Sequence, residues 1–260
     1  MRSHDQSVND QFDPQAEAYL TSRIHADGPD LRSAAARVAA WAPSSAEALD
    51  VGCGAGHLSF VLAPHLMRVT ALDPSQSMLA TVMRAAARRG LMQVSARQGR
   101  AEQLPYPDGQ FGLVCTRYSA HHWLDLPAAL HEMRRVLMAG GRLLLIDCLG
   151  EEHPLADTWL QSLELMRDPS HVRDRSLTQW RSLLTQAGFE CVEHEIFPTR
   201  IEFASWVQRL RTPGELVSAI RALQARAPAE VQAALQLEPD GSFTAQTGLF
   251  WAAPASREGV

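Results

Sequence analysis

A run of alternately spaced glycines between an apolar segment and a helix start is the feature that most constrains this chain. Residues 48–57 read Ala-Leu-Asp-Val-Gly-Cys-Gly-Ala-Gly-His. The apolar part predicts a buried strand, and Gly52, Gly54 and Gly56 predict a tight turn whose backbone can approach a ligand closely. A helix that begins near His57 would present unpaired backbone N–H groups to an anionic group. The run therefore predicts a cofactor-binding turn between a strand and a helix.

The nature of the cofactor depends on the acids around this turn. Asp50 stands two residues before the first glycine, and the glycine spacing differs from the G-x-G-x-x-G of dinucleotide sites. The apolar segment 69–73 ends in Asp73, close to the offset of roughly 20 residues at which nucleoside-binding units place a ribose-binding acid. Asp73 can accept hydrogen bonds from both hydroxyls of a free ribose, and can also cap the helix after Pro74. Met78, one turn into that helix, either packs on an adenine ring or lies in the core.

Composition is typical of a soluble enzyme with a large core. The chain has 260 residues, of which 46% are hydrophobic and 20% charged. No segment approaches the ~20 apolar residues of a membrane span, and the polar first residues do not predict a signal peptide. The four cysteines lack C-x-x-C spacing, which is typical of reduced thiols in a cytoplasmic protein. The net charge of −5 gives no reason to expect nucleic acid or a membrane as a partner.

Strands and helices alternate as far as Gly150, which predicts a parallel sheet with helices on both faces. The expected strands are 47–51, 69–73, 94–98, 112–116 and 142–148, and the expected helices are 30–41, 57–64, 76–89 and 126–137. Beyond Gly150, helices are expected at 155–166, 177–186 and within 203–236, and strands at 188–197 and 243–252. The segment 203–236, with Trp206 and Arg209, would cover a pocket or form a contact in a homodimer.

The chain as a whole resembles the class I S-adenosylmethionine-dependent methyltransferases, and within them the C-methyltransferase-like proteins of ubiquinone and menaquinone biosynthesis. The matching segments are 49–56, 71–73, 99–108 and 135–142, in the expected order. The resemblance implies an α/β, Rossmann-like fold: a seven-stranded, mostly parallel sheet with an antiparallel last strand, helices on both faces and a helical lid. It implies one domain over 1–260, with an N-terminal helical cover (1–40), a cofactor-binding core (41–150) and an acceptor side (151–260).

The same resemblance implies S-adenosylmethionine as cofactor, with S-adenosylhomocysteine as product. The family's third-strand motif often carries Gly-Asp-Ala-Glu, whose Asp accepts a hydrogen bond from the adenine amino group. Arg100 stands at that place and cannot accept, so Glu102 or a backbone carbonyl would have to, while the Ala101 N–H can meet a ring nitrogen. Tyr19 is expected to contact the methionine carboxylate or the acceptor, or to dock a helix together with Phe12. The expected cofactor residues are Asp50, Gly52, Gly54, Gly56, Asp73, Pro74, Met78, Arg100, Ala101, Glu102, Arg117 and Tyr19.

The segment after the fourth expected strand carries the candidate catalytic groups, Tyr118, His121 and His122. A sulfonium methyl group is electrophilic, so positioning of the acceptor supplies much of the rate, with acid–base help where the acceptor must lose a proton. One histidine is expected to serve as general base and the other to hydrogen-bond a backbone carbonyl; packing, cofactor capping and metal ligation are the alternatives.

A metal site would need a third ligand besides the two histidines. Asp125, Asp147 and His171 are candidates, but none lies at a persuasive spacing, and no metal is expected. The polar stretch 166–174 either borders the acceptor pocket or forms a solvated turn in which Asp168 and Asp174 cap helices.

The favoured function is methylation of a small aromatic or enolisable metabolite at oxygen, carbon or nitrogen. An RNA- or protein-modifying methyltransferase is disfavoured by the acidic balance and by the lack of an Asn-Pro-Pro-Tyr-type tetrad. The third alternative is a module that binds the cofactor without turning it over.

Overall fold

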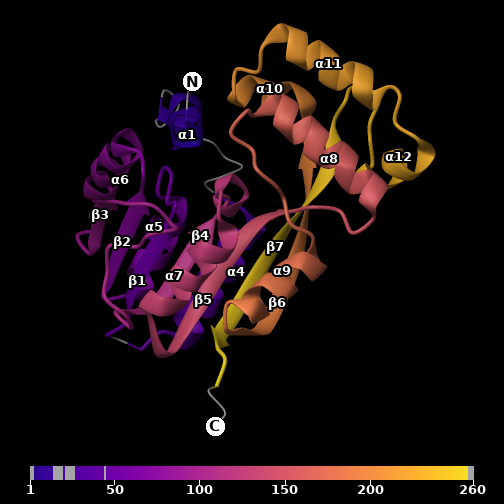
Figure 1. Ribbon diagram of the computed structural model, residues 1–260. Helices are drawn as coiled ribbons and strands as arrows, with labels where there is room; N and C mark the ends of the chain where they lie inside the picture. The colour runs from indigo at the N-terminus through magenta and orange to yellow at the C-terminus, as the bar shows by residue number, and fades with distance from the viewer. Residues whose placement is uncertain (1–2, 14–19, 21–26, 44, 257–260) are drawn as a thin grey trace.

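One seven-stranded sheet runs through the computed structural model, which describes residues 3–13, 20, 27–43 and 45–256 (Figure 1). The strand order is β3-β2-β1-β4-β5-β7-β6. Strands β1 to β5 pair in parallel, and β7 is antiparallel to both of its neighbours, as expected. The strands are β1 (Glu47–Val51), β2 (Arg68–Asp73), β3 (Val94–Gln98), β4 (Phe111–Arg117), β5 (Leu137–Leu149), β6 (Phe189–Ile201) and β7 (Phe243–Pro254).

The order of the strands places a crevice at the ends of β1 and β4. The chain moves outward in one direction from β1 to β3 and in the other from β4 onward. Open α/β sheets bind ligands at the carboxyl ends of the strands where the order reverses in this way. The glycine run after β1 therefore lies at the switch point of the sheet.

Helices cover both faces of the sheet, whose strands are apolar on both sides. Of the helices whose bounds the structure gives, three pack on one face, and two pack on the other. The residues of β4 are buried along its whole length, as the covering on both faces requires. The first group is α4 (Pro29–Trp41), α5 (His57–Leu62) and α6 (Gln76–Arg88), and the second is α7 (Leu126–Val136) and α9 (Leu177–Gln186).

A second, smaller apolar core lies at one end of the long strands β6 and β7 (Figure 1). It joins α8 (Pro154–Arg167), α10 (Phe203–Arg209), α11 (Gly214–Gln224) and α12 (Ala229–Leu235) to the strand residues Ile201 and Phe243. Helix α1 (His4–Phe12) lies at the same end of the sheet. Short 3₁₀ helices follow α5 and β4, η2 (Ala63–His65) and η3 (Ala120–His122). Among the residues described, no helix combines the length and the apolar character needed to span a membrane.

Some element boundaries differ from the sequence prediction. Strand β5 begins at Leu137, not at Arg142, because Leu137 already pairs with Phe111. Gly140, with φ of +78°, lies where the register shifts. Gly140 and Gly141 therefore form an irregularity inside the strand and not a turn before it. Strand β6 continues to Ile201, since it pairs with β7 along its whole length and its outer edge is free to carry Pro198.

Candidate active site

A cavity of about 270 Å³ opens at the carboxyl ends of the parallel strands and is closed from the far side by α1, α8 and α10. It brings together nearly all of the residues singled out from the sequence. Those that line it are Asp50, Gly52, Gly54, Asp73, Pro74, Met78, Arg100, Ala101, Glu102, Arg117, Tyr118, His121 and His122. Tyr19 lies outside the described residues. We call the part lined by Asp50, Gly52, Gly54, Asp73 and Met78 the glycine end, and the part lined by Tyr118, His121, Cys148, Glu164 and Asp174 the histidine end.

The glycine turn has the backbone that its sequence predicts. Gly52, Gly54 and Gly56 have φ of +68°, +51° and +88°, in the left-handed region that favours glycine. A Cβ on Gly54 would meet no atom of the described residues within 4 Å, so the cavity comes directly up to this backbone. The Gly54 N–H donates to the Asp73 carboxylate at 2.9 Å, which ties the turn to the end of β2.

Gly56 corrects the sequence prediction. It is not among the described residues that line the cavity. A Cβ at this position would lie 2.8 Å from the Phe60 ring and 3.0 Å from Val82. The physical reason for glycine here is therefore the close packing of α5 against α6, and not contact with a ligand.

Asp73 holds the turn and faces the cavity at the same time. Its second carboxylate oxygen accepts from the Ser75 N–H at 2.9 Å, and the Ser75 hydroxyl caps α6 by accepting from the Met78 N–H at 3.0 Å. Each carboxylate oxygen can accept more than one hydrogen bond, so both remain able to meet a hydroxyl group. Burial raises the pKa of Asp73 to about 6. Both roles foreseen for this residue, helix entry and ligand contact, are compatible with its geometry.

Asp50 presents a buried oxygen that the fold leaves without a partner. One carboxylate oxygen accepts from the Ser59 N–H at 3.1 Å and from the Ser59 hydroxyl at 2.6 Å. The other has no hydrogen-bond partner within the described part of the chain, although Asp50 is 1% exposed. Burial raises the pKa of Asp50 to about 6. An orphaned buried acceptor at the rim of the cavity suits a ligand that carries a positive charge or a donor.

The residues at the third-strand motif line the cavity beside Met78. The Arg100 Nε lies 3.8 Å from the Glu102 carboxylate, and Ala101 is 5% exposed. Arg100 cannot accept a hydrogen bond, whereas the Glu102 carboxylate at this place can. Met78 is 4% exposed, so it belongs to the core and to the cavity wall together.

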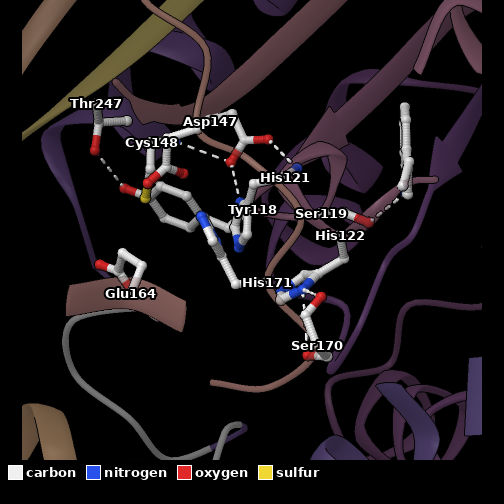
Figure 2. Close-up of polar contacts among 12 residues, drawn as sticks. Tyr118, Ser119, His121, His122, Asp147, Cys148, Glu164, Ser170, His171 and Thr247 are labelled. Carbon is white, nitrogen blue, oxygen red and sulfur yellow. Dashed lines mark hydrogen bonds and ion pairs between the residues drawn. The ribbon is translucent and has the colours of Figure 1, made fainter. Parts of the chain in front are cut away.

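Arg117 is fixed beside the cavity by a buried ion pair. Its Nε donates to the Asp30 carboxylate of α4 at 2.6 Å, and both side chains are almost fully buried. The guanidinium also lies 4.4 Å from the centre of the Tyr118 ring. Tyr118 has φ of +52°, an unusual backbone conformation for a non-glycine residue, and its hydroxyl contacts the Thr247 hydroxyl at 2.9 Å (Figure 2). Burial raises the pKa of Tyr118, which keeps the phenol protonated.

His121 is oriented by Asp147 (Figure 2). Its Nδ1 lies 2.6 Å from one carboxylate oxygen, and its backbone N–H donates to the other at 3.1 Å. Burial opposes charge on the ring, but the Asp147 carboxylate, with Asp174 and Glu164 beyond it, raises the pKa of His121 to about 9. A carboxylate on Nδ1 leaves Nε2 as the ring atom that can exchange a proton with a ligand.

His122 differs from its neighbour because its Nδ1 lies 3.0 Å from the Ser170 carbonyl oxygen (Figure 2). A carbonyl only accepts, so this nitrogen carries the proton of a neutral ring. Burial and the charge of His121 lower the pKa of His122 to about 4. The two rings lie 4.1 Å apart between centroids, and the Phe12 ring packs edge-on against His122 at 5.1 Å. The fold therefore makes one histidine a charged group and the other a neutral one that hydrogen-bonds a backbone carbonyl.

The stretch 166–174 borders the cavity, and the alternative of a solvated turn is wrong. Asp168, His171 and Asp174 all line the cavity and are each less than 9% exposed. The His171 Nε2 lies 2.8 Å from the Gln161 side-chain oxygen, and burial, with the charge of His121, lowers the pKa of His171 to about 3. The N-cap of α9 is Ser176, and neither Asp168 nor Asp174 caps this helix.

Other lining residues were not singled out from the sequence. Glu164 is an isolated acid on the Trp- and Leu-rich helix α8, a signal that the sequence contained; Thr247 and Cys148 lie in apolar strands and gave none. His4 and Val8 come from α1, which the sequence prediction placed only within a broad N-terminal cover.

One group of possible metal ligands is present within the described ranges. Donor atoms of His121, Asp147 and Cys148 lie within 4.8 Å of one another. Burial raises the pKa of the Cys148 thiol, which disfavours the thiolate that metals bind. Asp125, another candidate ligand from the sequence, instead caps α7 by accepting from the Ala128 N–H at 2.9 Å.

Comparison with known proteins identifies the family. Residues 49–145 match the family described as a methyltransferase domain. The chain is 43% identical to the uncharacterized protein YafE of Escherichia coli over 74% of this chain and 93% of that one. It is 33% identical to the uncharacterized methyltransferase YcgJ of Bacillus subtilis over 78% of this chain and 80% of that one.

A solved structure agrees with these matches over most of the chain. The putative methyltransferase BH2331 of Bacillus halodurans superimposes with a TM-score of 0.83 at 30% identity, covering 88% of this chain and all of that one. The fold, the glycine turn after β1 and these relatives lead to one conclusion. This chain belongs to the Rossmann-like class I methyltransferases and is a methyltransferase.

Proposed function

We propose that this methyltransferase transfers the methyl group of S-adenosylmethionine to a small-molecule acceptor held at the histidine end of the cavity. The observation that carries the proposal is the continuity of one cavity from the Asp73-braced glycine turn to the His121–Asp147 pair. A group bound at the glycine end and an acceptor bound at the histidine end would therefore share one enclosed space.

The glycine end fits the proposed cofactor. S-adenosylmethionine supplies a methyl group on a positively charged sulfur and carries an amino acid head and a ribose. The buried Asp50 oxygen without a partner would accept from its amino group, and the two Asp73 oxygens would accept from the ribose hydroxyls. Met78 and Ala101 would lie against the adenine. Burial disfavours the charged forms of both aspartates and so raises their pKa values. A cation or a hydroxyl pair bound at this end would stabilise these charged forms.

The histidine end supplies acid–base chemistry. His121 Nε2 would remove a proton from the acceptor, while Asp147 holds the ring and stabilises its positive charge. The Tyr118 phenol, protonated and fixed by Thr247, would position the acceptor by hydrogen bonding. His122, with its low pKa, would shape the wall and not exchange protons at neutral pH.

A small acceptor suits the way in which the cavity is closed. Helices α1, α8 and α10 all contribute side chains to its wall, so a long polymer would have to displace them. A relative that matches only part of the chain supports the same class: the demethylmenaquinone methyltransferase of Thermus thermophilus is 34% identical over 49% of this chain and 59% of that one.

Calorimetric titration of S-adenosylmethionine and S-adenosylhomocysteine, followed by a screen for transfer of a labelled methyl group, tests the proposal. We expect saturable binding of both, and product from at least one small acceptor. Absence of binding contradicts the proposal. Binding with turnover only on RNA or protein would show that the acceptor is a macromolecule. Binding without any turnover would favour a protein that senses the cofactor.

A further inference from the structure

Asp174 is a buried carboxyl for which the acid–base chemistry above gives no role. It is 3% exposed and lines the cavity. Its backbone is held on both sides by Gln161, whose side-chain oxygen accepts from the Asp174 N–H at 3.1 Å and whose amide donates to the Asp174 carbonyl at 3.0 Å. Its carboxyl oxygens, in contrast, make no hydrogen bond and no ion pair within the described residues. Buried polar groups rarely lack partners in native proteins, so the missing partner of Asp174 points to a ligand.

The charges around Asp174 indicate the sign of that ligand. Glu164 and Asp168 line the same end, and Asp147 lies directly behind His121. Of the arginines that line the cavity, Arg117 is paired with Asp30, and Arg167 lies 3.4 Å from the Glu164 carboxylate. Arg209 lines the cavity from α10. The four carboxyl groups at this end outnumber the positively charged His121, Arg167 and Arg209 by one, and that of Asp174 has no partner within the described residues, which favours a positively charged occupant.

The pKa of His121 agrees with a positively charged ligand at the histidine end. Burial, with the charges of Glu164, Asp147 and Asp157 outweighing the opposite effect of His121, raises the pKa of Asp174 to about 7. The carboxylates around His121 raise its pKa to about 9 despite its burial. The shift of His121, which overcomes its burial, reports a site that stabilises a positive charge, whereas the shift of Asp174 comes first from its burial.

We propose that the methyl acceptor is a primary or secondary amine, which enters as an ammonium ion and is held by the carboxyl groups of Asp174 and Glu164 beside His121. This inference rests on the proposed function. An ammonium ion would give the Asp174 carboxyl the hydrogen-bond donors that it lacks within the described residues, and a carboxylate or phenolate would be repelled by the surrounding acids.

The reaction at this site balances in protons and electrons. Two cations would repel each other there, so His121 releases its own proton to solvent as the ammonium ion binds. The ammonium nitrogen then gives one proton to Nε2 of His121, and its lone pair forms the bond to the methyl carbon. The carbon–sulfur bond breaks, and its electron pair stays on sulfur. The products are a methylated ammonium ion and S-adenosylhomocysteine. The carboxylates that raise the pKa of His121 also stabilise the imidazolium that this proton transfer forms.

Matched pairs of acceptors test the inference. The probes are benzylamine with benzyl alcohol, phenethylamine with 2-phenylethanol, and tyramine with its alcohol analogue, titrated into protein saturated with S-adenosylhomocysteine. We expect at least one amine to bind about tenfold or more tightly than its alcohol, as a hydrogen bond to a charged group implies. In separate assays with labelled S-adenosylmethionine, the label should appear on the nitrogen of that amine.

Single-charge variants locate the effect. Asp174→Asn and Glu164→Gln should each weaken amine binding by about ten- to a hundredfold and leave the affinities for the alcohols and for S-adenosylhomocysteine unchanged. The matched control is Asp108→Asn, which removes a carboxylate whose side chain is 82% exposed and which does not line the cavity; it should change none of these values. Circular dichroism and thermal melting confirm that each variant folds.

Three results would overturn the inference: no amine of the panel binds, amines and alcohols bind equally, or Asp174→Asn binds amines as the wild type does. The titration of S-adenosylmethionine on the same sample separates two kinds of failure. If the wild type does not bind S-adenosylmethionine, the result contradicts the proposed function. Its presence without a preference for amines contradicts the acceptor class alone.

Discussion

The two ends of the cavity are built in different ways. The glycine end comes from two consecutive strand-to-helix turns between Asp50 and Met78, and its shape is set by backbone groups that Asp73 braces. The histidine end is assembled from side chains on α1, η3, β5, α8, the stretch 166–174 and β7, which only the fold brings together. A site made of local backbone serves one ligand shape, whereas a site made of distant side chains can change with each substitution. The difference agrees with the proposal that a shared cofactor binds at the first end and the specific acceptor at the second.

Removing the base should break the histidine end alone, with the largest effect. We expect His121→Ala and Asp147→Asn to lower kcat by about 10²–10⁴, because general-base catalysis contributes on that order. The affinity for S-adenosylmethionine, measured by calorimetry, should stay within about twofold. A parallel loss of cofactor binding would show that the two ends are not separable.

The wild-type pH profile adds a second reading of the same group. Since the pKa of His121 in the free protein is raised to about 9, kcat/KM should rise with pH up to that region. The groups that face this ring are Asp147 on β5, Glu164 on α8, His122, His171 and Asp174. Asp174→Asn removes one of these carboxylates and should move the profile to lower pH. An unmoved profile would contradict the assignment of the base.

Asp73→Ala should break the glycine end. Two hydrogen bonds to a charged carboxylate are lost, and we expect the Kd for S-adenosylmethionine to rise about a hundredfold or more. Asp73→Asn keeps an acceptor and should retain part of the affinity. Because Asp73 also braces Gly54 and Ser75, thermal melts of both variants are needed beside the titrations. Equal affinities in wild type and Asp73→Ala would remove the ribose contact from the account.

Two glycine variants sharpen the assignment within the turn. Gly54→Ala places its Cβ in open space facing the ligand, so it should impair cofactor binding and reduce stability by about 1–2 kcal/mol through its positive φ. Gly56→Ala meets Phe60 and Val82 and should cost more stability, about 2–4 kcal/mol, with the smaller effect on binding. Urea denaturation should show the larger loss of stability for Gly56→Ala, and cofactor titration should show the larger loss of binding for Gly54→Ala. The same ranking in both assays would refute the packing role of Gly56.

The smallest effect concerns stability and pH. A carboxyl whose folded-state pKa is raised from 3.8 to about 7 adds stability at low pH that is lost as the pH rises through 7. Asp174→Asn does not titrate, so its melting temperature should exceed that of the wild type at pH 8, by about 2–4 °C for each kcal/mol gained. The difference should vanish near pH 4. A variant less stable than the wild type at pH 8 would mean that Asp174 has a structural partner.

The sequence predicted the glycine end better than the histidine end, for a physical reason. The positions of Asp50, Gly54 and Asp73 follow from local strand and turn chemistry within one βαβ unit, and the structure places all three at the cavity. The role of Gly56 was misjudged because glycine spacing does not separate a ligand contact from a close helix packing. Only the large side chain of Phe60, one turn later, carries that signal.

At the histidine end, the sequence identified His121 and His122 but not which of them is charged. Their difference arises from Asp147 and Ser170, which are distant in the chain and reach the rings only through β5 and the stretch 166–174. Glu164 was missed although an acid on a Trp- and Leu-rich helix was a signal, and Thr247 was missed because nothing in a strand pattern tells that one side chain faces a cavity. The stretch 166–174 was left between two interpretations, and burial of Asp168 and Asp174 decided between them.

A crystal structure of the protein with S-adenosylhomocysteine would test the central claim most directly, that one cavity joins a cofactor site to an acceptor site. The account predicts ribose hydroxyls on Asp73, the amino group beside Asp50 and the sulfur directed toward Tyr118 and His121. A ligand bound outside the glycine end, or one whose sulfur points away from His121, would contradict it.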